Sequence, residues 1–332
     1  MRFSYAVFLF LGIISGPVAF AQLRPLKVVA TTTVVADLCR TIGGDRVTVT
    51  AVVGPDQDPH LFSPTYQDLA LLRSADILVA VGLHFEGKMA AMLEEFAKSK
   101  PLISLASSIP PNLLIREQSP SAAADPHFWG DISLWARAGE YLAREFGEFD
   151  IGSRQSYLLR GQDHRRRMMR LHQDIARRLQ APPSGRRVLV TPHRSLAYFG
   201  AAYGWRILSL SGFTAETPKD AAAIATLSQQ IADKKIAAVM TEKSLSSEVL
   251  DEVVAQSAER GFRVVMGGEL RVDSLGPEKS LWATYEGMML ANVERLLAAV
   301  SIGEPLMPPP LAEVPPSGDV EIQPSPSVDP EE

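Results

Sequence analysis

The sequence contains a single cysteine, Cys39, among 332 residues. One thiol can form neither an internal disulfide nor a zinc site made of cysteines. Cys39 lies in an apolar helical pattern, which indicates a buried structural thiol. The fold therefore depends on a hydrophobic core. The sequence is 46% hydrophobic, and a chain of about 280 ordered residues is long enough for two domains.

Long hydrophobic runs are also lacking, and the one notable apolar stretch lies at the N-terminus. Met1-Arg2 precedes an apolar run over residues 7–14, and Ala19-Phe20-Ala21 matches an A-x-A cleavage site. Gly16-Pro17 interrupts the stretch, which is too short to span a bilayer. We expect residues 1–21 to be a secretory signal peptide and the mature chain to be exported. No cysteine lies near the cleavage site, so we expect no lipid anchor.

The chain lacks an excess of basic charge. Its formal net charge is −5, and residues 303–332 hold seven acidic groups, nine prolines and no basic group. Residues 22–302 are therefore close to neutral, which argues against nucleic-acid binding. The acidic tail, residues 303–332, is too rich in proline and polar groups to bury a core, and we expect it to be disordered.

Strand and helix patterns alternate along both halves of the chain, which predicts α/β lobes with mostly parallel sheets. The strands are predicted at residues 27–33, 46–53, 76–81, 102–105, 187–190, 206–210, 237–240 and 262–266. Between the halves, residues 153–180 contain no proline and one glycine, which predicts a long helix connecting the lobes. The predicted parts are a signal peptide (1–21), an N-terminal lobe (22–150), a linker helix (151–183), a C-terminal lobe (184–302) and the acidic tail (303–332).

Three of the six histidines directly follow a proline: His60, His127 and His193. Proline fixes its own φ and keeps the preceding residue extended, so each imidazole stands on a stiff loop. His60 and His193 come just after predicted strands, at the sheet edge where ligands bind in open α/β folds. Rigid placement of nitrogen donors is what a metal site requires. We hypothesise that these histidines converge on one metal ion.

A fourth ligand should come from the second lobe, and the residues leave three candidates. Asp273 lies in a loop flanked by glycines after the last predicted strand, Glu269 lies in the same stretch, and Glu242 ends the strand at 237–240. Spacing does not decide between them. Asp58, Asp125 and Glu242 are candidates for orienting the imidazoles by hydrogen bonds.

The chain contains a set of motifs: Gly54-Pro55-Asp56-Gln57-Asp58-Pro59-His60, Gly82-Leu83-His84-Phe85-Glu86-Gly87-Lys88-Met89, Asp125-Pro126-His127-Phe128-Trp129, Thr191-Pro192-His193, Gly268-Glu269-Leu270 with Asp273-Ser274-Leu275-Gly276, and Tyr285-Glu286-Gly287-Met288-Met289. In these motifs the sequence resembles a known family, the cluster A-I substrate-binding proteins of bacterial ABC importers for zinc, manganese or iron. The resemblance implies two lobes bridged by one long helix, with the metal between them. It places the metal ligands at His60, His127, His193 and Asp273, and leaves His84 outside the site. It further implies a periplasmic carrier and not an enzyme.

The implied partners are a divalent metal ion, a membrane ABC permease and a periplasmic metal-donor protein, and the chain is expected to be a monomer. Three imidazoles and a carboxylate suit Zn²⁺, whereas Mn²⁺ prefers more oxygen ligands. Mn²⁺ and Fe²⁺ stay as alternatives because no loop is rich in histidine, unlike many dedicated zinc members. His193, however, stands where many manganese and iron members carry Glu. Residues 277–282 also replace the small, glycine-rich segment common in the family.

Two other functions fit parts of the pattern. An exported zinc hydrolase would use the three histidines, a bound water and Asp273 or Glu242 as a base, but the sequence has no H-E-x-x-H helix. A binding protein for an organic solute would use the histidines only as hydrogen-bonding groups. His164 and His172 lie eight residues apart on the predicted long helix, and we expect them to face solvent.

Overall fold

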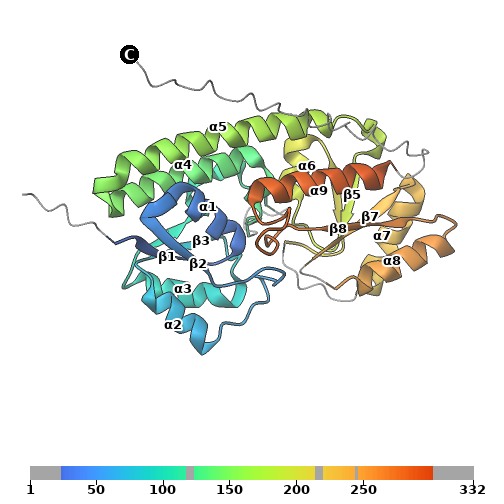
Figure 1. Cartoon of the computed structure of the whole chain (residues 1–332). Coiled ribbons are helices and arrows are strands. Elements are labelled where there is room, and N and C mark those ends of the chain that lie inside the picture. The colour runs from blue at the N-terminus through green and yellow to red at the C-terminus, as the bar shows by residue number, and fades with distance from the viewer. Residues whose placement is uncertain (1–23, 117–122, 214–219, 244–245, 302–332) are drawn as a thin grey trace, which may run out of the picture.

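The computed structural model describes residues 24–301, apart from 117–122, 214–219 and 244–245. The predicted signal peptide and the acidic tail lie outside the described residues. Among the helices of the described part, none is long and apolar enough to cross a membrane. The described chain forms two α/β lobes (Figure 1).

The N-terminal lobe is organised around a four-stranded parallel sheet. Its strands are β1 (Leu26–Ala30), β2 (Val47–Ala51), β3 (Ile77–Ala80) and β4 (Leu102–Ser104), in the order β2-β1-β3-β4. All four residues of β3 are buried, which explains its uninterrupted apolar sequence: a central parallel strand is covered on both faces. The predicted strands are thus found in the predicted order along the chain.

Helices cover both faces of this sheet (Figure 1). They are α1 (Thr33–Gly43), α2 (Tyr66–Ser74), α3 (Ala90–Ala97) and α4 (Ile132–Phe149). Alternate β1 residues serve the two faces: Val28 joins the core with α1 and α4, while Val29 packs with α2 and α3. The Thr32 hydroxyl accepts the N–H of Val35 and begins α1 immediately after the strand. A short strand-to-helix turn of this kind leaves the carboxyl edge of the sheet open for a site.

The predicted linker is a single helix, α5 (Arg154–Arg178). Figure 1 shows it running along both lobes, with α4 lying beneath it. At 1.5 Å per residue its length is about 37 Å. Its buried residues recur every three or four positions and form one stripe along the helix: Tyr157, Gly161, His164, Met168, Leu171 and Ile175. Packing along this stripe fixes α5 against its neighbours.

The expectation that His164 faces solvent is wrong. Its side chain is buried, with 3% of its surface exposed, and it packs against α4 at Gly139. A Cβ added at Gly139 would lie 2.2 Å from the His164 ring, so only glycine leaves room for the imidazole. Polar character was therefore a poor guide to the inner face of this helix. His172 is half-buried, and its Nδ1 lies 3.0 Å from the hydroxyl of Tyr203.

The C-terminal lobe contains two parallel strand pairs, with β5 beside β7. The strands are β5 (Val188–Thr191), β6 (Arg206–Ser209), β7 (Ala238–Glu242) and β8 (Val265–Leu270), and the helices are α6 (Ala197–Tyr203), α7 (Ala221–Lys234), α8 (Glu248–Glu259) and α9 (Tyr285–Val300). The last strand lies further along the chain than the predicted 262–266. Gly267, which the sequence places in a loop, lies within β8. The strand needs a glycine there, because a Cβ would come within 2.6 Å of Ala299 on α9.

Buried hydrogen bonds tie the two lobes together beside the linker helix. The indole N–H of Trp129 donates to the carbonyl of Val272 at 2.9 Å, and the hydroxyl of Tyr285 donates to the carbonyl of Trp129 at 2.6 Å. The backbone N–H of Tyr285, at the start of α9, donates to the carboxylate of Asp37 in α1. The main hydrophobic cluster also draws residues from both lobes. These contacts set the relative position of the loops that carry the candidate site.

Candidate metal centre

All four residues proposed as ligands lie in connections between secondary-structure elements. His60 lies in the loop after β2, and His127 directly precedes the short 3-10 turn Phe128–Gly130 that leads into α4. His193 follows β5 by two residues, and Asp273 follows β8 by three. Parallel strands present their carboxyl ends at the same edge, so loops far apart in sequence meet there.

The structure brings all four side chains together. One ligand atom from each lies within 4.8 Å of every other. The Nε2 atoms of His60 and His127 are 3.2 Å apart. The Asp273 carboxylate oxygens lie 3.4 Å from Nε2 of His127, 3.5 Å from Nε2 of His193 and 3.8 Å from Nε2 of His60. No other group of three or more His, Cys, Asp or Glu side chains in the described ranges has this metal-site geometry.

These separations match the size of a coordination shell. Four ligands at about 2.05 Å from a tetrahedral zinc ion would stand about 3.3 Å apart. The distances between the imidazole nitrogens and Asp273 exceed that value by about half an ångström at most. The remaining pairs of ligand atoms lie within 4.8 Å, so the side chains would have to move closer together to complete the shell around an ion.

The four side chains are removed from water. His127 and His193 are 0% exposed, Asp273 is 1% exposed and His60 is 6% exposed. Nε2 of His193 and both carboxylate oxygens of Asp273 have no hydrogen-bond partner in the structure. Buried polar atoms are normally paired, and leaving one unpaired costs about 1–3 kcal/mol. A bound cation would satisfy all of them at once, so the donor set fits a divalent metal.

Two buried carboxylates orient the imidazoles. Oδ1 of Asp125 lies 2.7 Å from Nδ1 of His127, and Oε1 of Glu242 lies 3.1 Å from Nδ1 of His193. Each carboxylate accepts a hydrogen bond from the N–H at Nδ1, which leaves the lone pair of Nε2 facing the centre of the site. Two of the three candidates for this role thus contact a ring. Asp58 instead accepts the backbone N–H of His60, so it fixes the loop and not the imidazole.

The two rival ligands take other positions. Glu242 is engaged with His193 and also accepts the hydroxyl of Ser195 at 3.1 Å. Glu269 lies within β8, half-exposed, 3.5 Å from the amine of Lys243. Neither belongs to the group of atoms around the centre, so the geometry favours Asp273 over both.

Electrostatics in the metal-free site reflect burial. Burial lowers the pKa of His60 to about 2 and lowers that of His127 well below its usual range. Burial raises the pKa of Asp273 well above its usual range. Burial also acts to lower the pKa of His193, but the hydrogen bond with Glu242 and the charges of Glu242, Asp273 and Asp58 together outweigh it and raise that pKa to about 9. A divalent cation at the centre would favour neutral imidazoles and an ionised Asp273, the forms that bind metals.

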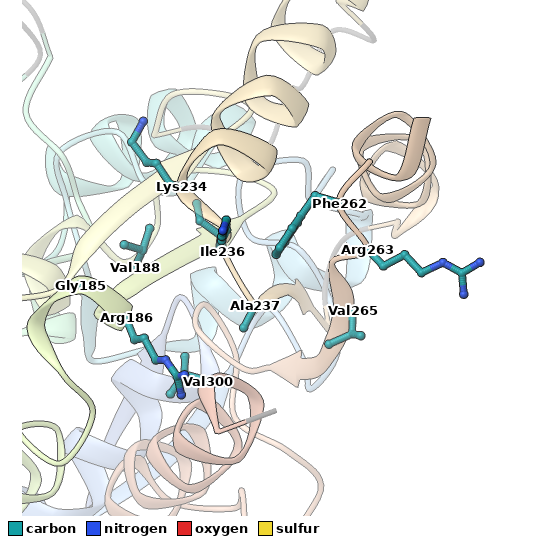
Figure 2. Close-up of a pocket in the computed structure, with 11 residues that line it drawn as sticks. Gly185, Arg186, Val188, Lys234, Ile236, Ala237, Phe262, Arg263, Val265 and Val300 are labelled. Atoms are coloured by element: carbon teal, nitrogen blue, oxygen red, sulfur yellow. The ribbon is translucent and has the colours of Figure 1, made fainter. Parts of the chain in front are cut away.

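A separate pocket of about 200 Å³ lies at the opposite ends of the C-terminal strands (Figure 2). Its walls include Val188, Phe262 and Val265, and basic side chains flank it. Figure 2 shows Lys234 and Arg263 extending in different directions, so their charges do not converge on one point. No histidine, cysteine or carboxylate lines this pocket. It therefore offers no alternative metal site.

The chain has two α/β lobes with parallel sheets, a long helix that joins them, and three imidazoles and a carboxylate clustered between them. These features define a metal-binding substrate-binding protein of an ABC importer. The chain belongs to the family described as ZnuA, the periplasmic component A of the zinc-uptake complex, which it matches over residues 28–299. The resemblance noted in the sequence is thereby confirmed.

Relatives of the chain are named for different metals. It is 32% identical over 277 residues to the manganese-binding lipoprotein MntA of Bacillus subtilis, covering 83% of this chain and 90% of that protein. It is 30% identical over 283 residues to the zinc-binding protein TroA of Treponema pallidum, covering 85% and 91%. The iron-binding protein YfeA of Yersinia pestis is 28% identical over 273 residues, covering 82% and 86%.

The fold matches a solved relative over nearly the whole length of that relative. The periplasmic zinc-binding protein TroA of Treponema pallidum superposes with a TM-score of 0.79 at 29% identity, covering 83% of this chain and 99% of that one. The predicted fold class, two α/β lobes with mostly parallel sheets and one linker helix, is confirmed. Because the named metals differ at similar identities, overall similarity alone does not determine which metal this chain binds.

Proposed function

We propose that the protein captures a divalent transition metal outside the cytoplasm, zinc in preference to manganese or iron, and delivers it to a membrane ABC permease. The observation that carries this proposal is the buried cluster of His60, His127, His193 and Asp273, whose ligand atoms lie within 4.8 Å of one another. Membership of the zinc-uptake family supports the same function. The metal is cargo, so the site has to bind it tightly and also release it.

The donor set supports zinc. Three imidazole nitrogens and one carboxylate fill a tetrahedral shell, which zinc accepts readily, whereas manganese prefers more oxygen ligands. Asp273 could supply a second oxygen, since its two oxygens face different histidines. Manganese or iron would therefore have to be held by five donors in the same space. We propose that this difference gives zinc the higher affinity.

A carrier fits the site better than a hydrolase. A catalytic zinc keeps an open position for water or substrate, whereas four protein ligands close the shell. Asp273 lies within 3.8 Å of an Nε2 atom of all three histidines and is not turned away as a base would be. Glu242, the other candidate base, is engaged with His193 and Ser195.

Metal analysis tests the proposal. The mature chain, stripped of metal at pH 7.5, should bind one equivalent of zinc, and zinc should displace manganese and ferrous iron in competition. His193→Ala should lose zinc binding while both lobes stay folded, as judged by circular dichroism. Failure to bind any of the three metals would refute the carrier function. Preference for manganese would refute only the choice of metal.

The proposed location is the periplasm. That proposal rests on the predicted signal peptide and on the family description. MntA of Bacillus subtilis is named a lipoprotein, whereas the absence of a lipid anchor from this chain was expected from residues outside the described part. That expectation stays a prediction, and mass spectrometry of the mature chain from a membrane fraction would check it.

A further inference from the structure

Only one of the four proposed ligands meets solvent to any measurable degree. His60 is 6% exposed, against 1% or less for the others. It lines a pocket of about 260 Å³ to which both lobes contribute, with Leu83 and His84 from the N-terminal lobe and Phe213 from the C-terminal lobe. We refer to it as the His60 pocket. A metal ion that enters through this pocket reaches His60 before the other ligands.

The backbone at the wall of this pocket is strained. Leu83 and His84 have φ values of +56° and +62°, in the left-handed region. Each residue other than glycine in this region costs about 1–2 kcal/mol, and two such residues in succession are rarely found. Strain of this kind persists only where the surrounding structure fixes it, and it concentrates at functional sites.

The residues that follow supply this fixation. The Phe85 ring packs edge-on against the His60 imidazole, with centroids 4.6 Å apart. The buried carboxylate of Glu86 accepts the Thr31 hydroxyl at 2.9 Å and the N–H of Val81 at 2.7 Å. A Cβ at Gly87 would lie 2.1 Å from the carbonyl oxygen of His60. The turn is thus locked onto the backbone of His60 and holds His84 on the pocket wall.

The chemistry of the wall singles out His84. Among the residues lining the His60 pocket, His60 and His84 are the two whose side chains can bind a metal. The His84 side chain is exposed, and it makes no side-chain hydrogen bond to another residue in the described ranges. An imidazole with a free lone pair at the mouth of the pocket can replace one water of a hydrated zinc ion.

We propose that His84 is a capture ligand: it binds the incoming ion transiently and passes it to His60, without belonging to the final site. This inference rests on the proposed function. A hydrated ion exchanges its waters one at a time, and a ligand next to the site raises the effective concentration of the ion there. Such a group lowers the barrier equally in both directions, so it changes the rates of binding and release but not the affinity.

His84→Asn tests the proposal, because asparagine tolerates a positive φ but has no imidazole. Zinc association is followed by stopped flow, and release is followed after addition of excess chelator. We expect both rate constants to fall at least about fivefold, a barrier change of about 1 kcal/mol, while the dissociation constant stays the same. The matched control is Leu83→Asn, which lies on the same wall with the same sign of φ. Its two rate constants should stay at the wild-type values.

Several results would overturn the inference. Wild-type rates in His84→Asn would show that the imidazole is not on the path. An unchanged association rate with faster release would show that His84 holds the bound ion. Slowing in Leu83→Asn as well would assign the effect to the turn and not to the imidazole. If the wild-type chain binds none of zinc, manganese and ferrous iron, the proposed function fails and the capture role with it, whereas wild-type rates in His84→Asn overturn the capture role alone.

Discussion

Replacing Asp273 with asparagine should have opposite effects on stability and on metal binding. The carboxylate is 1% exposed and neither oxygen has a hydrogen-bond donor in the structure. In the metal-free protein the burial of this carboxylate therefore lowers the free energy of unfolding. Burial disfavours the ionised form and raises the pKa of Asp273; Asp273→Asn keeps the shape of the side chain, cannot ionise and adds an amide that can donate to the Nε2 atoms around it. We expect the free energy of unfolding of metal-free protein to rise by about 1 kcal/mol, within the range of about 1–3 kcal/mol for an unsatisfied buried group.

The same substitution should cost metal affinity. Four-ligand zinc sites bind with about 10–16 kcal/mol at pH 7, or roughly 3 kcal/mol per ligand. Losing the one charged ligand should therefore weaken zinc binding by about 100-fold or more. Urea unfolding in the presence of a chelator gives the stability, and competition with a chromophoric chelator gives the affinity.

Asp37→Asn is the matched control. Asp37 is a half-buried carboxylate with a structural partner, since it accepts the N–H of Tyr285 at 3.0 Å. The amide oxygen of asparagine can still accept this N–H, so the replacement should change stability by less than about 1 kcal/mol and leave zinc affinity unchanged. An Asp273→Asn variant that destabilises the metal-free protein, or that binds zinc as tightly as the wild type, would contradict this prediction.

Three further predictions concern other parts of the molecule. Asp125→Asn removes the charge that orients His127 and should weaken zinc binding by about 10- to 100-fold; unchanged affinity in the chelator competition would argue against this role. Burial and then Arg167 lower the pKa of His164 to about 4, so the unfolded chain takes up a proton first as the pH falls below about 6.5. His164→Met should therefore lose about 2 kcal/mol less stability than the wild type between pH 7 and pH 5 in urea titrations, and equal losses would contradict it. Deleting residues 303–332 should leave zinc affinity nearly unchanged, because the site lies within residues 60–273, and a large loss by the same competition would reveal a role for the tail.

The sequence was sufficient for the parts of this protein that local chemistry determines. The Pro-His steps marked His60, His127 and His193, and strand and helix periodicity predicted the alternation of elements in both lobes. Asp273 could not be separated from Glu242 and Glu269 by spacing, since all three lie at or after strands of the same lobe. The resemblance to the family supplied that choice, and the structure brings Asp273 to the same point as the histidines.

Other features depend on packing, which a sequence read alone does not show. Glycine at 267 looked like the start of a loop but is required by the contact of β8 with α9. His164 looked like a surface residue, although Gly139 on α4 makes room for its ring. The distinction between Asp125 and Asp58, one contacting an imidazole and the other a backbone N–H, also depends on positions fixed in three dimensions.

We propose that three imidazoles and one carboxylate bind a single ion between the lobes. X-ray absorption spectroscopy at the zinc edge, on protein loaded with one equivalent, identifies the atoms bound to that ion. We predict a coordination shell of three nitrogen ligands of the imidazole type and one or two oxygens at about 2.0–2.2 Å, without sulfur, and the loss of one imidazole in His127→Ala. A shell dominated by water oxygens, or one that is unchanged in His127→Ala, would show that these four side chains do not bind the ion.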